Sequence, residues 1–123
     1  SFSYPASVSN DTIEKAIKSK LSKELHVECM HNYDPVFFDQ NGFLCKTLQS
    51  AYEDVTGMNG TPVTTTGGTY AKIMPNIVPF GPSFPGQKGI GHNPNEWMDR
   101  SDLILNTKIY ALSIVRLANG KNN

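Results

Sequence analysis

The sequence predicts an α/β fold in which helices pack on a small mixed β-sheet. Short β-like runs alternate with longer helical patterns, in the order strand, helix, strand, then helix, strand, helix, strand, helix. The length of 123 residues is that of one ordinary domain, and a hydrophobic content of 38% is enough for a modest core. We therefore expect each apolar helix face to be covered by the sheet.

The first part of the chain predicts a strand followed by a helix. Aromatic residues alternate with serines over residues 1–5, as in a short strand. Asp11 and Glu14 have the spacing of a capping box, in which each side chain reaches a free amide of the first helical turn. Apolar residues then recur at helical spacing as far as Leu25, which predicts a helix of that length.

A second strand and a boundary follow this helix. Residues 26–30 have the composition of a strand, and the Tyr33-Asp34-Pro35 turn comes after them. We expect two structural units, 1–36 and 37–123, to meet at this turn.

The second unit predicts three helical segments and two short strands. Gly57 should end a helix over residues 42–56 in the left-handed conformation, and Gly120 should end another over residues 101–119. Strands are expected at residues 62–66 and 77–81, with one helical turn at 70–74 between them. The predicted buried stripe of the last helix comprises Leu103, Ile104, Thr107, Tyr110, Ala111, Ile114, Val115 and Ala118.

Composition excludes several classes of partner. Eleven basic and eleven acidic residues balance, which argues against nucleic acid and anionic membrane surfaces. No apolar run approaches the roughly 20 residues of a membrane span. Cys29 and Cys45 are too few for a disulfide scaffold, so we expect reduced thiols in a cytoplasmic protein. Because a strand pattern begins at the first residue without an initiator Met, we expect the chain to be part of a longer protein.

Most of the candidate functional residues lie between Gly67 and Glu96. His92 follows a run of small residues that leaves its imidazole accessible, so it is either a solvated loop histidine or a zinc ligand. Glu96 either orients His92 as a second-shell carboxylate or pairs with Arg100 at helical spacing. The Gly67-Gly68-Thr69 segment is either a tight turn or a place where a ligand approaches the backbone.

Taken together, the motifs of this stretch resemble one family. They are Gly67-Gly68-Thr69-Tyr70-Ala71, Pro79-Phe80-Gly81, Phe84-Pro85-Gly86 and His92-Asn93-Pro94-Asn95-Glu96-Trp97, followed by a long helix. In this order they resemble the C-terminal end of the two-zinc dipeptidases of the PepV type, relatives of carnosinase, aminoacylase and succinyl-diaminopimelate desuccinylase. The resemblance implies that residues 1–36 are the last strand-helix-strand of a lid domain. It implies that residues 37–123 are the C-terminal part of the catalytic domain.

The resemblance also implies a mechanism and a set of roles. In the family, two zinc ions hold a water whose pKa the metal lowers, and this water hydrolyses the peptide bond of a dipeptide. His92 matches the last metal ligand, and Gly67, Gly68 and Thr69 match the turn against the bound dipeptide. The other ligands and the general base belong to an N-terminal half, so this chain holds no catalytic residue and is expected to be inactive alone.

One departure from the family pattern leaves other functions open. Ser3 stands where the family carries an arginine that grips the substrate carboxylate, and a serine cannot replace a bidentate guanidinium. The alternatives are a related deacylase of N-acyl amino acids, or a non-catalytic homologue that acts as a binding or interaction module. Because few strands are available to cover the apolar helices, we also expect self-association as a homodimer.

Overall fold

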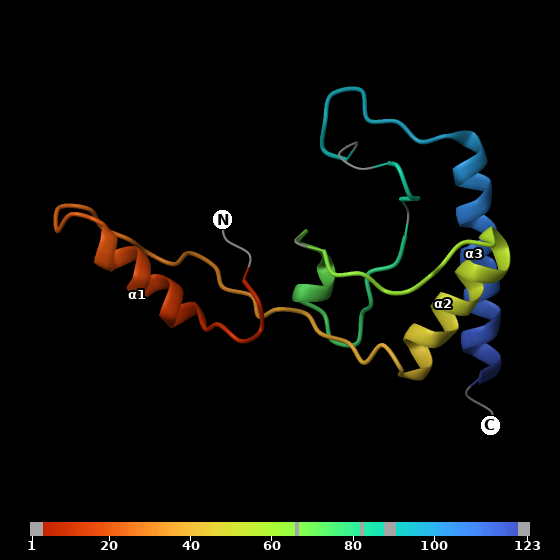
Figure 1. Ribbon diagram of the computed structural model, residues 1–123, viewed down its shortest axis with the longest axis horizontal. Helices are drawn as coiled ribbons and strands as arrows, with labels where there is room; N and C mark the ends of the chain where they lie inside the picture. Colours follow the sequence, from red (N-terminus) through yellow and green to blue (C-terminus); the bar gives the residue numbers. More distant parts are fainter. Residues whose placement is uncertain (1–3, 66, 82, 88–90, 121–123) are drawn as a thin grey trace. The chain divides into compact units, whose positions relative to one another are not determined.

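The computed structural model describes residues 4–65, 67–81, 83–87 and 91–120. Its helices are α1 (Asn10–Lys20), α2 (Phe43–Thr56) and α3 (Arg100–Asn119), with a single 3-10 turn, η1 (Tyr70–Lys72) (Figure 1). The chain divides into two compact units. One comprises Ser1–Phe37 and Thr65–Ile77, and the other comprises Phe38–Thr64 and Val78–Asn123.

The predicted α/β class is wrong for the described residues, because they contain helices and no strand. The segments expected as strands at 26–30, 62–65 and 77–81 are irregular, and residues 1–3 and 66 of the expected strands lie outside the described residues. A strand exists only when a neighbour supplies partners for its backbone amides and carbonyls. These segments have suitable composition but form no ladder with one another, so the part of the chain that the structure describes offers no sheet for the helices to cover.

The residue ranges of the two units differ from the two consecutive ranges that we expected. Its first break follows Phe37, but residues 65–77 belong with the first unit rather than the second. Whether the units correspond to a lid domain and a catalytic domain stays a prediction.

In the first unit, α1 begins two residues earlier and also ends earlier than the sequence pattern indicated. Ser9, rather than Asp11, is the N-cap, and its hydroxyl oxygen accepts a hydrogen bond from the Thr12 amide at 3.3 Å. The helix ends at Lys20, so the apolar residues from Leu21 to Leu25 lie beyond it. α1 buries none of its residues, because no sheet lies against its apolar positions.

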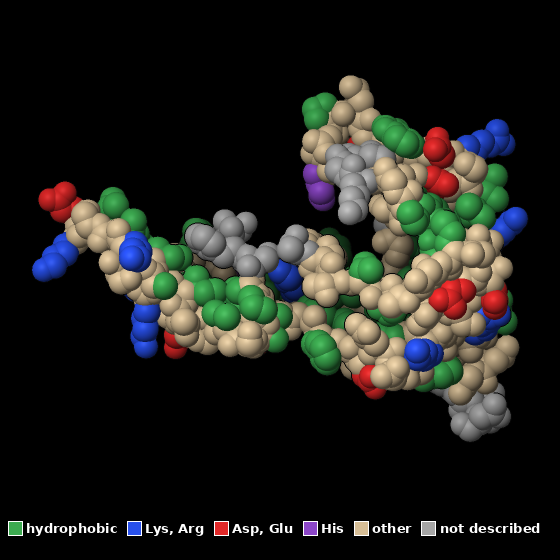
Figure 2. All heavy atoms as spheres, in the orientation of Figure 1, with side chains coloured by type: hydrophobic (Ala, Val, Ile, Leu, Met, Phe, Trp, Pro, Cys, Tyr) green, Lys and Arg blue, Asp and Glu red, His purple; other side chains and the backbone are tan. Residues whose placement is uncertain are grey.

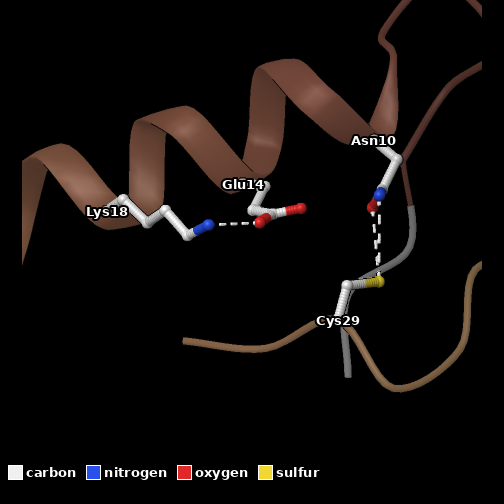
Figure 3. A network of polar contacts seen from close by, with 4 residues as sticks. All are labelled: Asn10, Glu14, Lys18 and Cys29. Atoms are coloured by element: carbon white, nitrogen blue, oxygen red, sulfur yellow. Dashed lines mark hydrogen bonds and ion pairs between the residues drawn. The ribbon is translucent and has the colours of Figure 1, made fainter. Parts of the chain in front are cut away.

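The segment after α1 returns toward the start of the helix (Figure 1). Figure 3 shows the contact between them, in which the Asn10 amide lies 3.8 Å from the Cys29 sulfur. The same figure shows the ion pair between Lys18 and Glu14 on one face of α1. Such exposed contacts contribute little stability each.

The second unit is built on the pairing of α2 with α3. α2 ends at Gly57, which has φ 69° and donates its amide hydrogen to the Glu53 carbonyl, as the sequence predicted. Its buried residues are Cys45, Leu48 and Ala51. Arg116 of α3 reaches across to α2, donating to the Ser50 hydroxyl at 2.8 Å and to the Asp54 carboxylate at 2.5 Å.

The stripe predicted to be buried on α3 is instead exposed. All eight of its residues are exposed, and Ile114 keeps 67% of its surface in solvent. The buried residues of α3 are Asn106, Ile109 and Ser113, which share the face that carries Arg116. Figure 2 shows apolar side chains at the surface of this helix pair. Within the described ranges, no helix has the length and apolar character needed to span a membrane.

Candidate functional site

The candidate site of the second unit is the turn that carries His92. His92 has φ 63° and Asn95 has φ 61°, a left-handed conformation that residues other than glycine adopt uncommonly. The Glu96 amide donates to the Asn93 carbonyl at 3.2 Å, and the Asn93 side chain donates to the Gly91 carbonyl at 3.1 Å. Local hydrogen bonds therefore hold this strained turn, and backbone strain of this kind is concentrated at functional sites.

Glu96 contacts His92, but through the main chain. One carboxylate oxygen of Glu96 accepts the His92 amide hydrogen at 3.3 Å, and the other lies beside Gly91. The ion pairs among the described residues do not include one between Glu96 and Arg100. Glu96 thus fixes the backbone of the turn, whereas a direct role in orienting the imidazole stays a prediction.

The side chain of His92 is exposed, which leaves its two ring nitrogens accessible to a metal. The described residues contain no group of three or more His, Cys, Asp or Glu side chains that could together hold an ion. A catalytic zinc needs three protein ligands and an open position. This part of the chain therefore fits a zinc site only as the donor of one imidazole.

The second candidate segment, Gly67-Gly68-Thr69, precedes η1 in the first unit. Thr69 is the N-cap, and its hydroxyl accepts the Ala71 amide hydrogen at 3.2 Å. Gly67 and Gly68 are exposed, and neither has a positive φ. A side chain added at Gly68 would meet nothing within 4 Å, so neither a left-handed turn nor packing within this chain requires glycine there.

The two candidate segments lie in different units. Ser3, the position at which the chain departs from the family arginine, lies outside the described residues.

Two contacts that the sequence did not reveal attach Phe80 and Gln87, which precede His92 in the sequence, to α3. The Tyr110 hydroxyl donates to the Phe80 carbonyl at 2.8 Å, and the Gln87 side-chain amide donates to the Asp102 carboxylate. Tyr110 was assigned to a buried apolar stripe, and Gln87 lies in a run that is only recognisable as irregular. No sequence signal distinguishes either residue, because both partners are distant along the chain.

Comparison with known proteins places these observations in a family. Residues 4–116 match the family model described as peptidase family M20/M25/M40. The chain is 35% identical over 116 residues to "Putative dipeptidase YtjP" of Bacillus subtilis, an alignment that covers 90% of this chain and 23% of the relative. It is 33% identical over 114 residues to "Beta-Ala-Xaa dipeptidase" of Lactobacillus delbrueckii subsp. lactis, covering 93% of this chain and 24% of the relative. No solved structure matches the chain.

The extent of these alignments limits what the chain can contain. It spans about a quarter of the length of the curated relatives that it matches. Any site that requires residues from the remainder of such a protein is therefore incomplete within these 123 residues.

Proposed function

The chain belongs to peptidase family M20/M25/M40, and we propose that it forms the C-terminal part of a cytoplasmic dipeptidase. In this proposal the complete enzyme hydrolyses the peptide bond of a dipeptide by using a water that two zinc ions activate. When bound, the zinc ions would lower the pKa of that water so that it attacks at neutral pH. The dipeptidase names of the relatives and the His92 turn support the proposal.

We propose that His92 donates one imidazole nitrogen to the metal site. The observation that supports this role most strongly is its exposed position in a left-handed turn whose backbone Glu96 holds. A non-glycine residue in this conformation costs about 1–2 kcal/mol, and the hydrogen bonds around the turn offset that cost. The backbone that carries the imidazole is therefore held in place while the side chain is exposed, an arrangement that suits a metal ligand.

We further propose that Gly67, Gly68 and Thr69 lie against the bound dipeptide. Gly68 has open space around its Cβ position, so a substrate backbone could approach it closely. The Thr69 hydroxyl already accepts the Ala71 amide, and its own hydrogen remains available to a substrate carbonyl.

The rest of the polypeptide is the partner that this proposal requires. One imidazole without a general base leaves no route to an activated water, so the 123-residue chain alone should have no peptidase activity. We also propose that the isolated chain forms a homodimer through the exposed stripe of α3, because a monomer would leave that stripe in water.

The first experiment compares the complete protein with its His92→Ala variant. We expect His92→Ala to lower zinc affinity, measured by competition with a chromophoric chelator, by at least about 100-fold, because even outer-sphere partners of a zinc ligand are worth 10–100-fold. Hydrolysis of a β-Ala-containing dipeptide should fall in parallel.

An exposed histidine elsewhere provides the matched control. His31 lies in the first unit and is exposed, so His31→Ala should leave zinc affinity unchanged. Unaltered zinc binding by His92→Ala would refute the ligand role. Turnover by the 123-residue chain that disappears in His92→Ala would refute the requirement for the rest of the protein.

A further inference from the structure

The chain contains three Asn-Gly dipeptides, at residues 41–42, 59–60 and 119–120. In such a dipeptide the glycine amide nitrogen can attack the side-chain amide carbon of the asparagine, because glycine has no Cβ to obstruct the approach. The amide must lose its proton before it attacks, so the group that accepts its hydrogen bond governs how readily the dipeptide reacts.

The Gly60 amide has a charged acceptor, unlike the other two glycine amides. It donates to Oε1 of the Glu53 carboxylate at 3.1 Å. The Gly42 and Gly120 amides each donate to a backbone carbonyl. Charge-assisted hydrogen bonds are roughly twice as strong as neutral ones, so the Gly60 proton is the most firmly held of the three.

The close approach of the chain to α2 explains why glycine occupies position 60. A Cβ there would lie 3.0 Å from Tyr52 Cδ1, 3.1 Å from the Gln49 carbonyl oxygen and 3.1 Å from Glu53 Cγ. These distances are shorter than ordinary van der Waals contacts, so a side chain at this position would displace the chain from the helix. The same packing that requires Gly60 therefore places a susceptible Asn-Gly dipeptide beside α2.

The side chain of Asn59 is held in a form that favours attack. Its Oδ1 accepts the Thr61 amide hydrogen at 2.9 Å and the Thr61 hydroxyl hydrogen at 2.7 Å. Donors at a carbonyl oxygen stabilise the negative charge that develops there when a nucleophile adds to the carbon. These two bonds do not protect Asn59, so the resistance of the dipeptide depends on the Gly60 amide.

We infer that Asn59 is a latent deamidation site and that the Glu53 carboxylate keeps it unreacted. Loss of the Gly60 proton would create a negative nitrogen beside the carboxylate oxygen that now lies 3.1 Å away, and a like charge so close disfavours ionisation. The inference concerns the residues that follow α2 and does not depend on the role of His92.

Glu53 is suited to hold the Gly60 proton but not to remove it. The Gln49 side chain donates to the same carboxylate oxygen at 2.9 Å, which fixes the acceptor in place. The hydrogen bonds from Gln49 and from the Gly60 amide keep the pKa of Glu53 below its ordinary value. A carboxylate with a lowered pKa is a weak general base, so the proton has to leave to solvent.

The reaction that Glu53 suppresses consumes water and releases ammonia. A base from solvent removes the Gly60 amide proton, and the nitrogen forms a bond to Cγ of Asn59 while the bond from Cγ to Nδ2 breaks. Nδ2 takes a proton from solvent and leaves as ammonia, which produces a cyclic imide. Water then opens either imide carbonyl and yields an aspartyl or an isoaspartyl residue. Because the imide has no hydrogen on its nitrogen, Glu53 loses this donor when the ring forms.

Glu53→Ala removes the acceptor and tests the inference directly. In the complete protein at neutral pH, we expect Glu53→Ala to raise the deamidation rate at Asn59 about tenfold, the factor that one hydrogen bond to a charged group is worth. Glu53→Gln should raise it less, because a neutral amide oxygen can still accept the Gly60 hydrogen. Trypsin places the three dipeptides on different peptides, so mass spectrometry of one digest measures all three rates.

Two controls separate this contact from a general loosening of the second unit. The rates at Asn41 and Asn119 are measured in the same sample and should not change in Glu53→Ala. Asp54→Ala removes the neighbouring carboxylate of α2, which accepts a hydrogen bond from Arg116. It should leave the rate at Asn59 unchanged.

Faster deamidation at Asn59 alone in Glu53→Ala supports the inference. An unchanged rate would refute it, and a slower rate would refute it by showing that the carboxylate acts as the base. A parallel rise at Asn41 and Asn119 would refute it because loosening of the unit would then be the cause. An equal rise at Asn59 in Asp54→Ala would refute it because any negative charge on α2 would then suffice.

Discussion

Ser113 offers the sharpest test of how the second unit is packed. The residue is 3% exposed, and among the described residues its hydroxyl oxygen is buried without a hydrogen-bond partner. Ser113 lies three residues before Arg116, which reaches α2, so both residues belong to the buried face of α3. We predict that Ser113→Ala stabilises the protein, which is unusual for a substitution at a buried position.

The expected stabilisation by Ser113→Ala is the sum of two contributions. Leaving a buried hydroxyl unpaired costs about 1–3 kcal/mol, and alanine is favoured over serine in a helix by about 0.5 kcal/mol. The free energy of unfolding should therefore rise by about 1.5–3.5 kcal/mol. Urea denaturation followed by far-ultraviolet circular dichroism measures this, and the midpoint should move up without a change in slope.

Thr107→Ala controls for helix propensity on the same helix. The Thr107 hydroxyl is exposed and donates to the Leu103 carbonyl at 2.8 Å, so its loss should change stability by no more than about 0.5 kcal/mol. A Ser113→Ala variant that is no more stable than wild type would show that the hydroxyl has a partner or that the face is not packed as described.

Two further predictions concern acid stability and association. Hydrogen bonds from Gln49 and from the Gly60 amide hold the pKa of Glu53 below its ordinary value, so its stabilising contribution should be present above pH about 4.3 and be lost as pH falls through the lowered pKa. In Gln49→Ala the pH dependence of unfolding across this window should become weaker, because only the hydrogen bond from the Gly60 amide remains. For association, sedimentation at micromolar concentration should show the 123-residue chain as a dimer and Ile114→Ser, within the exposed stripe, as a monomer. A wild-type monomer that binds no hydrophobic dye would contradict this expectation.

The helices were predictable from sequence because their signals are local. Gly57 adopts the left-handed conformation that ends α2, Gly120 follows the last residue of α3, and Thr69 caps the short turn at Tyr70. The strands failed because strand formation is not local. The run at 26–30 has a strand-like composition, but backbone pairing depends on a neighbour that no feature of the run itself specifies.

The family was predictable from the sequence, but the geometry of the candidate site was not. Motif order identified the family to which the chain belongs, and the roles that it assigned to His92 and Glu96 stay predictions. Spacing alone favoured a pair between Glu96 and Arg100, yet the carboxylate accepts the His92 amide because the intervening turn has two left-handed residues. Left-handed conformations at histidine and asparagine leave no clear mark in a sequence, so the contact could not be derived beforehand.

The error on α3 has a physical cause that connects packing with the site. Amphipathic patterns are interpreted on the assumption that a helix buries one side, but α3 carries apolar residues at Ile109 on its buried face and at several positions of the exposed stripe, among them Leu103 and Ile114. A helix with apolar residues on two faces is suited to contact neighbouring structure on both sides, and within the described residues α2 supplies one such contact. Tyr110 belongs to the exposed stripe, and its hydroxyl also holds the Phe80 carbonyl. Any surface that covers the stripe would therefore also cover Tyr110, the residue that attaches Phe80 to α3.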